Sequence, residues 1–204
     1  CVALGRMLHR KFKSQMPTRL LRESWLTTPP RAGVPPFLRP WLTDPASLTS
    51  RIRARCNRCS VRVVEQRLGT AQLDEAALLG LHPGERVWVR EVLLFADDRP
   101  VVFGRSLLPR RNLRGAWNLF HGMGARPLGA ALFADPAISR SPLTCKRFDA
   151  RDARYHRARS ARAQHDTTAS IPREVWARRS LFSRHGRALL VSEFFLPEIF
   201  ELPR

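Results

Sequence analysis

The sequence lacks any uninterrupted apolar run close to the roughly 18 residues that a membrane-spanning helix needs. Its longest apolar stretches, such as residues 92–96, are short and typical of strands. We therefore expect a soluble protein with no stable insertion into a membrane. The apolar share of 44% is ordinary for a globular domain and excludes a wholly disordered chain. A length of 204 residues leaves room for one domain and little more.

Cysteine is scarce, with four residues in the chain. Cys56 and Cys59 form one C-x-x-C pair, but no second pair follows, and Cys1 and Cys145 stand alone. A structural zinc site needs four ligands, usually in two paired sets, and the histidines show no spacing that would complete one. We therefore expect no metal site and no organic cofactor. So few cysteines also argue against a secreted disulfide scaffold and favour the reduced cytoplasm.

Lysine is almost absent, so that 33 of the 36 basic residues are arginines, against 17 acidic residues and a formal net charge of +19. Nucleic-acid binding would explain this charge and would predict tight, salt-dependent association. GC-rich coding, which favours Arg over Lys together with Ala and Pro, explains it equally simply. Because the arginines are scattered and no compact run mixes them with stacking aromatics, we favour the compositional explanation and expect no nucleic-acid partner.

The first 30 residues are basic and lack the apolar core of a secretory signal. We expect a poorly ordered extension over 1–30, with Met7 or Met16 as the natural start. An amphipathic targeting segment is the alternative. A proline-rich stretch then leads into a single domain over 31–204.

Hydrophobic periodicity predicts about six strands, mostly in hairpins, with helices between them. The expected strands are residues 59–67, 86–96, 101–108, 138–148, 175–184 and 187–196. Asp44 and Pro45 are typical of a helix start, and this helix should end near Asn57 with Leu48 and Ile52 facing the core. Because strands and helices do not alternate regularly, we expect an antiparallel sheet with helices packed on it, an α+β domain.

Residues 149–170 contain five arginines, three aspartates and almost no large apolar side chain. Such a composition cannot bury much apolar surface. We therefore interpret this segment as an inserted, mobile, arginine-rich loop.

Two charged residues fall on apolar strand faces. Arg90 alternates with Trp88, Val92 and Leu94, and Glu193 falls in the same way among apolar residues of the last strand. Arg105 lies between two apolar residues of its own strand. A charge on a buried face is costly unless it is paired or binds something. The charges could pair with structural partners or lie on partly solvated faces.

Periodicity alone does not decide which face is inward, since the opposite face of the first strand is equally apolar. Glu91 and Ser192 would then be the inward polar groups. The functional interpretation is a small enclosed pocket in which Arg90 receives an anionic ligand. A glutamate at Glu193 in such a pocket would have its pKa raised by desolvation and could donate a proton.

Five blocks in this order resemble the chorismate pyruvate-lyase family of bacterial ubiquinone biosynthesis. They are WVREVLL (88–94), GRSLLP (104–109), PLGAALF (127–133), WARRS (176–180) and LVSEFFLP (190–197). Each block alone is weak evidence for this family, whereas five blocks in the same order with compatible spacing are strong evidence. The resemblance covers about residues 40–148 and 173–200. The insertion at 149–170 and Leu48, where some members have Met, depart from the family pattern.

The resemblance implies a single-domain, six-stranded antiparallel sheet with helical flaps that cover an internal ligand cavity. It implies conversion of chorismate to 4-hydroxybenzoate and pyruvate without metal or cofactor. By the same resemblance, Arg90 holds the ligand carboxylate, the backbone N–H of Leu128 adds a hydrogen bond, and Glu193 contacts the far end of the ring. Leu48 lines the cavity. The basic pair Arg178 and Arg179 also matches the family, without a catalytic role assigned to it.

We therefore expect a cytoplasmic, monomeric lyase in which Arg90 clamps the ring carboxylate and Glu193 assists at the ether oxygen as an acid. A non-catalytic sensor of the same fold, which holds an aromatic acid without turning it over, is the alternative. Retention of both Arg90 and Glu193 favours the enzyme, and no helix-turn-helix pattern is visible.

Overall fold

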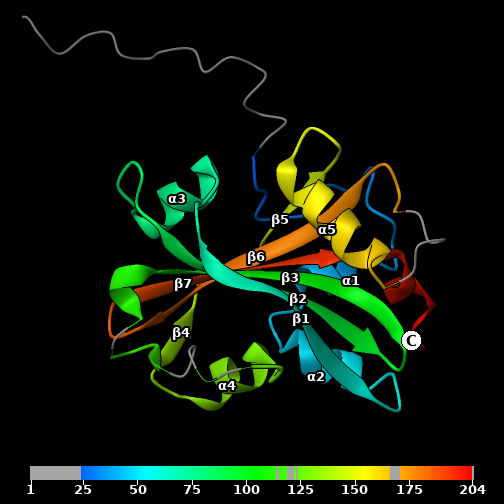
Figure 1. Cartoon of the computed structure of the whole chain (residues 1–204). Coiled ribbons are helices and arrows are strands. Elements are labelled where there is room, and N and C mark those ends of the chain that lie inside the picture. Colours follow the sequence, from blue (N-terminus) through cyan, green and yellow to red (C-terminus); the bar gives the residue numbers. More distant parts are fainter. Residues whose placement is uncertain (1–23, 114, 119–121, 123, 166–170, 204) are drawn as a thin grey trace, which may run out of the picture.

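Seven antiparallel strands form one sheet in the computed structural model, which describes residues 24–113, 115–118, 122, 124–165 and 171–203 (Figure 1). The strand order is β1-β2-β3-β7-β6-β4, and β5 pairs with β6 as well. The strands are β1 (Cys59–Gly69), β2 (Val87–Ala96), β3 (Arg99–Pro109), β4 (Ile138–Arg140), β5 (Thr144–Phe148), β6 (Val175–Arg184) and β7 (Arg187–Phe195). The predicted α+β class with an antiparallel sheet is thus confirmed.

The expectation of six strands is wrong, because the single strand expected over 138–148 is two strands. Residues 141–143 separate β4 from β5, and Pro142 has no backbone N–H to continue a ladder. Both strands pair with β6, Arg140 opposite Phe182 and Thr144 opposite Arg179. The break matters for the site, because it fixes Arg140 at the end of a three-residue strand.

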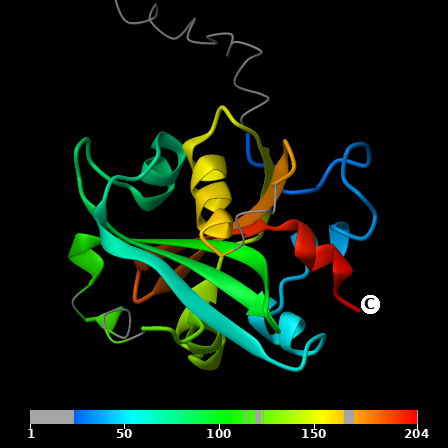
Figure 2. The same cartoon turned by 45° about the vertical axis from the view of Figure 1, so that its right-hand side comes forward.

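Helices cover both faces of the sheet, which gives three layers (Figures 1 and 2). On one face lie α1 (Arg39–Thr43), α2 (Leu48–Arg53) and α4 (Leu128–Ala134), and on the other lie α3 (Leu73–Leu79) and α5 (Ala153–Ala163). Two 3₁₀ helices, η2 (Arg110–Asn112) and η4 (Pro197–Glu201), follow β3 and β7. None of the helices in the described part of the chain has the length and apolar character needed to cross a bilayer.

Helix α2 begins later and ends earlier than predicted. Its N-cap is Ser47, whose Oγ accepts a hydrogen bond from the backbone N–H of Ser50. Asp44 instead ends α1, and its carboxylate pairs with Arg51 at 2.7 Å. The helix ends at Arg53 rather than near Asn57. Leu48 and Ile52 face the core as predicted.

The mobile loop expected over 149–170 is in large part helix α5, and residues 166–170 lie outside the described residues. Asp152 caps the helix, and Tyr155, Ala158 and Ala161 pack against the sheet at helical spacing. Alanine side chains let a helix lie close to a sheet without large apolar groups. The polar composition of this segment therefore led to the wrong prediction of a loop. The apolar face of the helix consists mainly of small residues at helical spacing.

Ion pairs fasten α3 and α5 to their face of the sheet. Arg105 of β3 bonds the fully buried Glu75 at 3.1 Å and Glu91 at 2.6 Å, while Arg154 of α5 bonds Asp74 at 3.0 Å. Burial alone would raise the pKa of Asp74, but its bonds to Arg154, Trp25 and Arg179 outweigh this and lower the pKa to about 2. The stabilisation from Asp74 is therefore complete above its ordinary pKa and is lost only as the pH falls towards 2.

The domain begins before residue 31. The backbone of Leu26 pairs with Cys145 of β5 through two hydrogen bonds of 2.8 Å, and the Trp25 indole donates to Asp74 at 2.8 Å. Trp25 and Leu26, which fall within the expected extension, are therefore joined to the folded part. The remainder of the predicted extension, residues 1–23, lies outside the described residues.

Candidate active site

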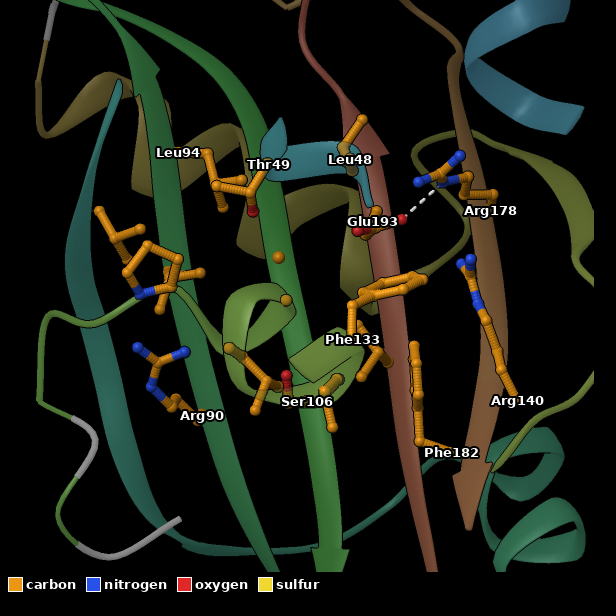
Figure 3. A pocket seen from close by; sticks show the side chains of 18 residues that line it. Leu48, Thr49, Arg90, Leu94, Ser106, Phe133, Arg140, Arg178, Phe182 and Glu193 are labelled. Atoms are coloured by element: carbon orange, nitrogen blue, oxygen red, sulfur yellow. Dashed lines mark hydrogen bonds and ion pairs between the residues drawn. The ribbon is translucent and has the colours of Figure 1, made fainter. Parts of the chain in front are cut away.

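A cavity of about 50 Å³ lies between the sheet and the helices α2 and α4 (Figure 3). Strands β2, β3, β6 and β7 form its floor, and its apolar walls carry three guanidinium groups and one carboxylate. The residues that line it are Leu48, Thr49, Val61, Arg90, Val92, Leu94, Gly104, Ser106, Pro127, Leu128, Gly129, Leu132, Phe133, Arg140, Arg178, Phe182, Val191 and Glu193. The four residues singled out from the sequence, Leu48, Arg90, Leu128 and Glu193, all lie around this one cavity.

The structure decides which strand face is inward to the cavity. Arg90, Val92 and Leu94 of β2 line the cavity, whereas Glu91 faces the opposite side of the sheet. Arg105 also faces that opposite side, where Glu75 and Glu91 neutralise it. Arg105 of β3 therefore has structural partners, whereas Arg90 of β2 lies at the cavity.

Arg90 is a buried cation that forms no ion pair with any of the described residues. It is 1% exposed, and its Nη2 donates to the backbone carbonyls of Gly124 at 2.9 Å and Arg126 at 3.1 Å. Its Nε has no hydrogen-bond partner among the described residues, and none of their carboxylates forms an ion pair with it. Burial lowers the pKa of Arg90 from its ordinary value. Such a group is costly unless it is paired, and it is suited to receive an anion.

Glu193 lies across the cavity from Arg90 and is part of an ion pair (Figure 3). Its Oε2 accepts a hydrogen bond from Nε of Arg178 at 2.5 Å. Arg178 is held in turn, because its Nη1 donates to the carbonyls of Trp41 at 2.8 Å and Asp44 at 2.9 Å. Glu193 thus accepts a hydrogen bond from a guanidinium that is itself fixed by the backbone. The acid role that the sequence suggested for Glu193 stays a prediction, and this pairing makes a proton-accepting role its alternative.

Helices α2 and α4 bring Leu48 and Leu128 to the cavity. Leu48 is the first residue of α2, and Leu128 is the first residue of α4, directly after Pro127. The two helices meet closely at Gly129, where an added Cβ would lie 3.2 Å from Oγ1 of Thr49. A glycine at this position therefore permits the close approach of the two helices that cover the cavity.

Sequence reasoning did not find Arg140, Phe133 and Phe182 as cavity residues. The alternation of polar and apolar residues could not single out Arg140, because its strand is only three residues long. The pairing of this strand with β6 decides on which face of the sheet the Arg140 side chain lies. Arg178 and Phe182 lie on the same face of β6, as alternation along the expected strand would have indicated. In the described residues, no group of three or more His, Cys, Asp or Glu side chains is placed to hold a metal ion.

A family model described as "Chorismate lyase" matches residues 19–204. A protein of Aromatoleum aromaticum named "Probable chorismate pyruvate-lyase" is 63% identical over 181 residues, which cover 89% of this chain and 96% of the relative. A protein of the same name from Azoarcus sp. is 60% identical over 182 residues, covering 89% of this chain and 94% of the relative.

Among solved structures, PhnF from Mycobacterium smegmatis has a TM-score of 0.52 over 75% of this chain and 64% of PhnF. The sequence identity is 17%, so that this likeness concerns the fold alone.

Proposed function

This chain belongs to the chorismate lyase family, and on this premise we propose that it cleaves chorismate to 4-hydroxybenzoate and pyruvate. The reaction supplies the aromatic ring of ubiquinone. One observation in the site carries the proposal. A buried guanidinium without an anionic partner, Arg90, faces the sole carboxylate among the described lining residues, Glu193, across an apolar cavity.

Chorismate is a cyclohexadiene that bears a ring carboxylate, a hydroxyl at C4 and an enolpyruvyl ether at C3. Loss of the side chain breaks the C3–O bond and removes the C4 proton, and the ring becomes aromatic. The chemistry is therefore downhill, and the protein needs mainly to orient the dianion and to stabilise the leaving oxygen.

Arg90 binds the ring carboxylate and orients the substrate along the cavity. We expect its Nε, which has no partner among the described residues, and the N–H of Leu128 to bind this same carboxylate, while Leu48 packs on the ring. The C4 end of the ring is then directed to Glu193 on the opposite side.

Glu193 accepts the C4 proton as a general base. The electron pair of the C4–H bond completes the ring, and the pair of the C3–O bond goes to the enolpyruvyl oxygen. Arg178, whose buried Nη2 has no partner among the described residues, stabilises the charge that develops on this oxygen. The proton then passes from Glu193 to the methylene carbon of the enolate, which becomes the methyl group of pyruvate.

The helices α2 and α4 act as the flaps of the cavity. The cavity of about 50 Å³ is small beside chorismate, and we expect these covers to move outward to admit it. Once closed, they keep water from the reacting atoms. We further propose that the protein acts as a cytoplasmic monomer on this small molecule, without a nucleic-acid partner.

The test is to mix the purified protein with chorismate in the presence of EDTA and to follow both products. We expect 4-hydroxybenzoate and pyruvate in equal amounts, well above the spontaneous rate. Tight binding of 4-hydroxybenzoate without turnover would contradict the proposal and would identify a sensor of the same fold. Activity that is lost with EDTA and restored by a divalent cation would contradict the metal-free mechanism.

A further inference from the structure

Arg140 is a second cavity arginine without an ion-pair partner in the described part of the chain. Its Nε donates to Oγ of Ser180 at 2.8 Å and its Nη1 to the carbonyl of Pro45 at 2.5 Å. No hydrogen bond of its Nη2 to a described residue is present. The guanidinium is thus held in place from one side, while one terminal nitrogen is left with donor capacity for a ligand.

The rings of Phe133 and Phe182, which contact each other edge to face, both lie against the guanidinium of Arg140. Its central carbon lies 5.4 Å from the centroid of the first ring and 5.2 Å from that of the second. Cation–π contacts of this kind stabilise the charge and limit the rotamers of a long side chain. Arg140 is therefore preorganised to meet a planar anion.

The charges around the cavity do not balance. Arg90, Arg140 and Arg178 face it, and Glu193 is the lone carboxylate among the described lining residues. Because Glu193 pairs with Arg178, the excess positive charge remains at Arg90 and Arg140. The cavity therefore matches a dianion whose two negative groups are separated. 4-Hydroxybenzoate, with one carboxylate, would neutralise only one of these two charges.

Arg140 also lies where the cavity meets the surface. Together with Phe133 it lines both the internal cavity and a surface hollow of about 550 Å³. In Figure 3, Arg140 lies on the same side as Arg178 and Glu193, opposite Arg90. A side chain that extends from the ring beyond Glu193 would therefore reach Arg140, with open space behind it.

We propose that Arg140 binds the carboxylate of the enolpyruvyl side chain of the substrate. This inference rests on the proposed function and adds the second anchor of the substrate. Arg90 is engaged by the ring carboxylate at the opposite side, and Arg178 is paired with Glu193 and with two backbone carbonyls, so that only its Nη2 is left for the leaving oxygen. Arg140 is the remaining lining arginine without an ion-pair partner among the described residues, and it distinguishes the two-carboxylate substrate from the one-carboxylate aromatic product.

The experiment compares wild-type protein with Arg140→Gln and Arg140→Lys, measuring KM and kcat for chorismate and the inhibition constant of 4-hydroxybenzoate. We expect Arg140→Gln to raise KM for chorismate by about 30-fold or more, because a charge-assisted contact is lost. The inhibition constant of 4-hydroxybenzoate should change by less than about threefold, since this acid does not reach Arg140. Arg140→Lys should recover part of the loss.

Arg184→Gln is the matched control. Arg184 is also partly buried and bonded to a backbone carbonyl, that of Ala116 at 2.8 Å, but it does not line the cavity. An unchanged KM in Arg140→Gln, or equal weakening of both ligands, would overturn the assignment. If Arg140→Gln does not fold, Arg140→Ala removes the same charge, and an unchanged KM for chorismate in that variant would overturn the assignment instead. A wild-type protein that releases no product would contradict the proposed function, which is a separate result.

Discussion

Replacement of Arg90 by alanine is expected to weaken binding of both chorismate and 4-hydroxybenzoate by at least about 100-fold. Removal of one member of a buried, hydrogen-bonded charge pair typically costs about 2–5 kcal/mol, or roughly 30- to several thousand-fold in affinity. Arg90 is buried, and no described carboxylate competes with the ligand for its guanidinium. Among the described lining residues, no other cation lies at that side of the cavity to take the ligand carboxylate.

The same substitution should change the melting temperature little, because two effects oppose each other. Removal of Arg90 relieves the desolvation of a cation without an ion-pair partner in the described residues, but it also removes the hydrogen bonds to the carbonyls of Gly124 and Arg126. Isothermal titration with 4-hydroxybenzoate and a thermal melt measure the two effects. Arg86→Ala is the control, because Arg86 is exposed just before β2 and bonds the carbonyl of Leu68. Unchanged affinity for the product would remove Arg90 from the site.

Replacement of Glu193 by glutamine is expected to lower kcat by about 10²–10⁴-fold, the range of a general acid or base. The change preserves size and an oxygen that can accept a hydrogen bond, but glutamine cannot take a proton. Arg178 keeps its two backbone carbonyl partners in the variant. We therefore expect the affinity for 4-hydroxybenzoate to change far less than kcat.

The control for Glu193 is Glu198→Gln, because Glu198 pairs with Arg162 away from the cavity. If Glu193→Gln retains turnover, positioning by Arg90 and its neighbours carries the catalysis alone.

Strand and hairpin patterning predicted most of the sheet. The apolar runs around the turns at Asp97 and His185, which both adopt positive φ, gave the hairpins β2–β3 and β6–β7 nearly to the residue. Alternation also placed Arg90 and Glu193 on apolar faces. Only the fold, however, shows that these two faces meet at the same cavity, since β2 and β7 are joined through β3.

Two parts of the molecule were beyond the reach of sequence patterns. Helix α5 buries alanines and paired arginines, so that its helical period is hidden by its polar composition. Arg140 lies on a short strand whose facing depends on a partner 40 residues away, Ser180, and on the ring of Phe182. The pairing of Arg178 with Glu193 likewise depends on the register between β6 and β7. The sequence of either strand alone does not give this register.

A structure of the protein with bound 4-hydroxybenzoate tests the central claim most directly. We expect the product in the cavity between α2, α4 and the sheet, with its carboxylate on Arg90 and the N–H of Leu128 and its hydroxyl at Glu193. The side of Arg140 should hold no part of this ligand. A product bound in the reverse orientation, or outside this cavity, would contradict the roles assigned to Arg90 and Glu193.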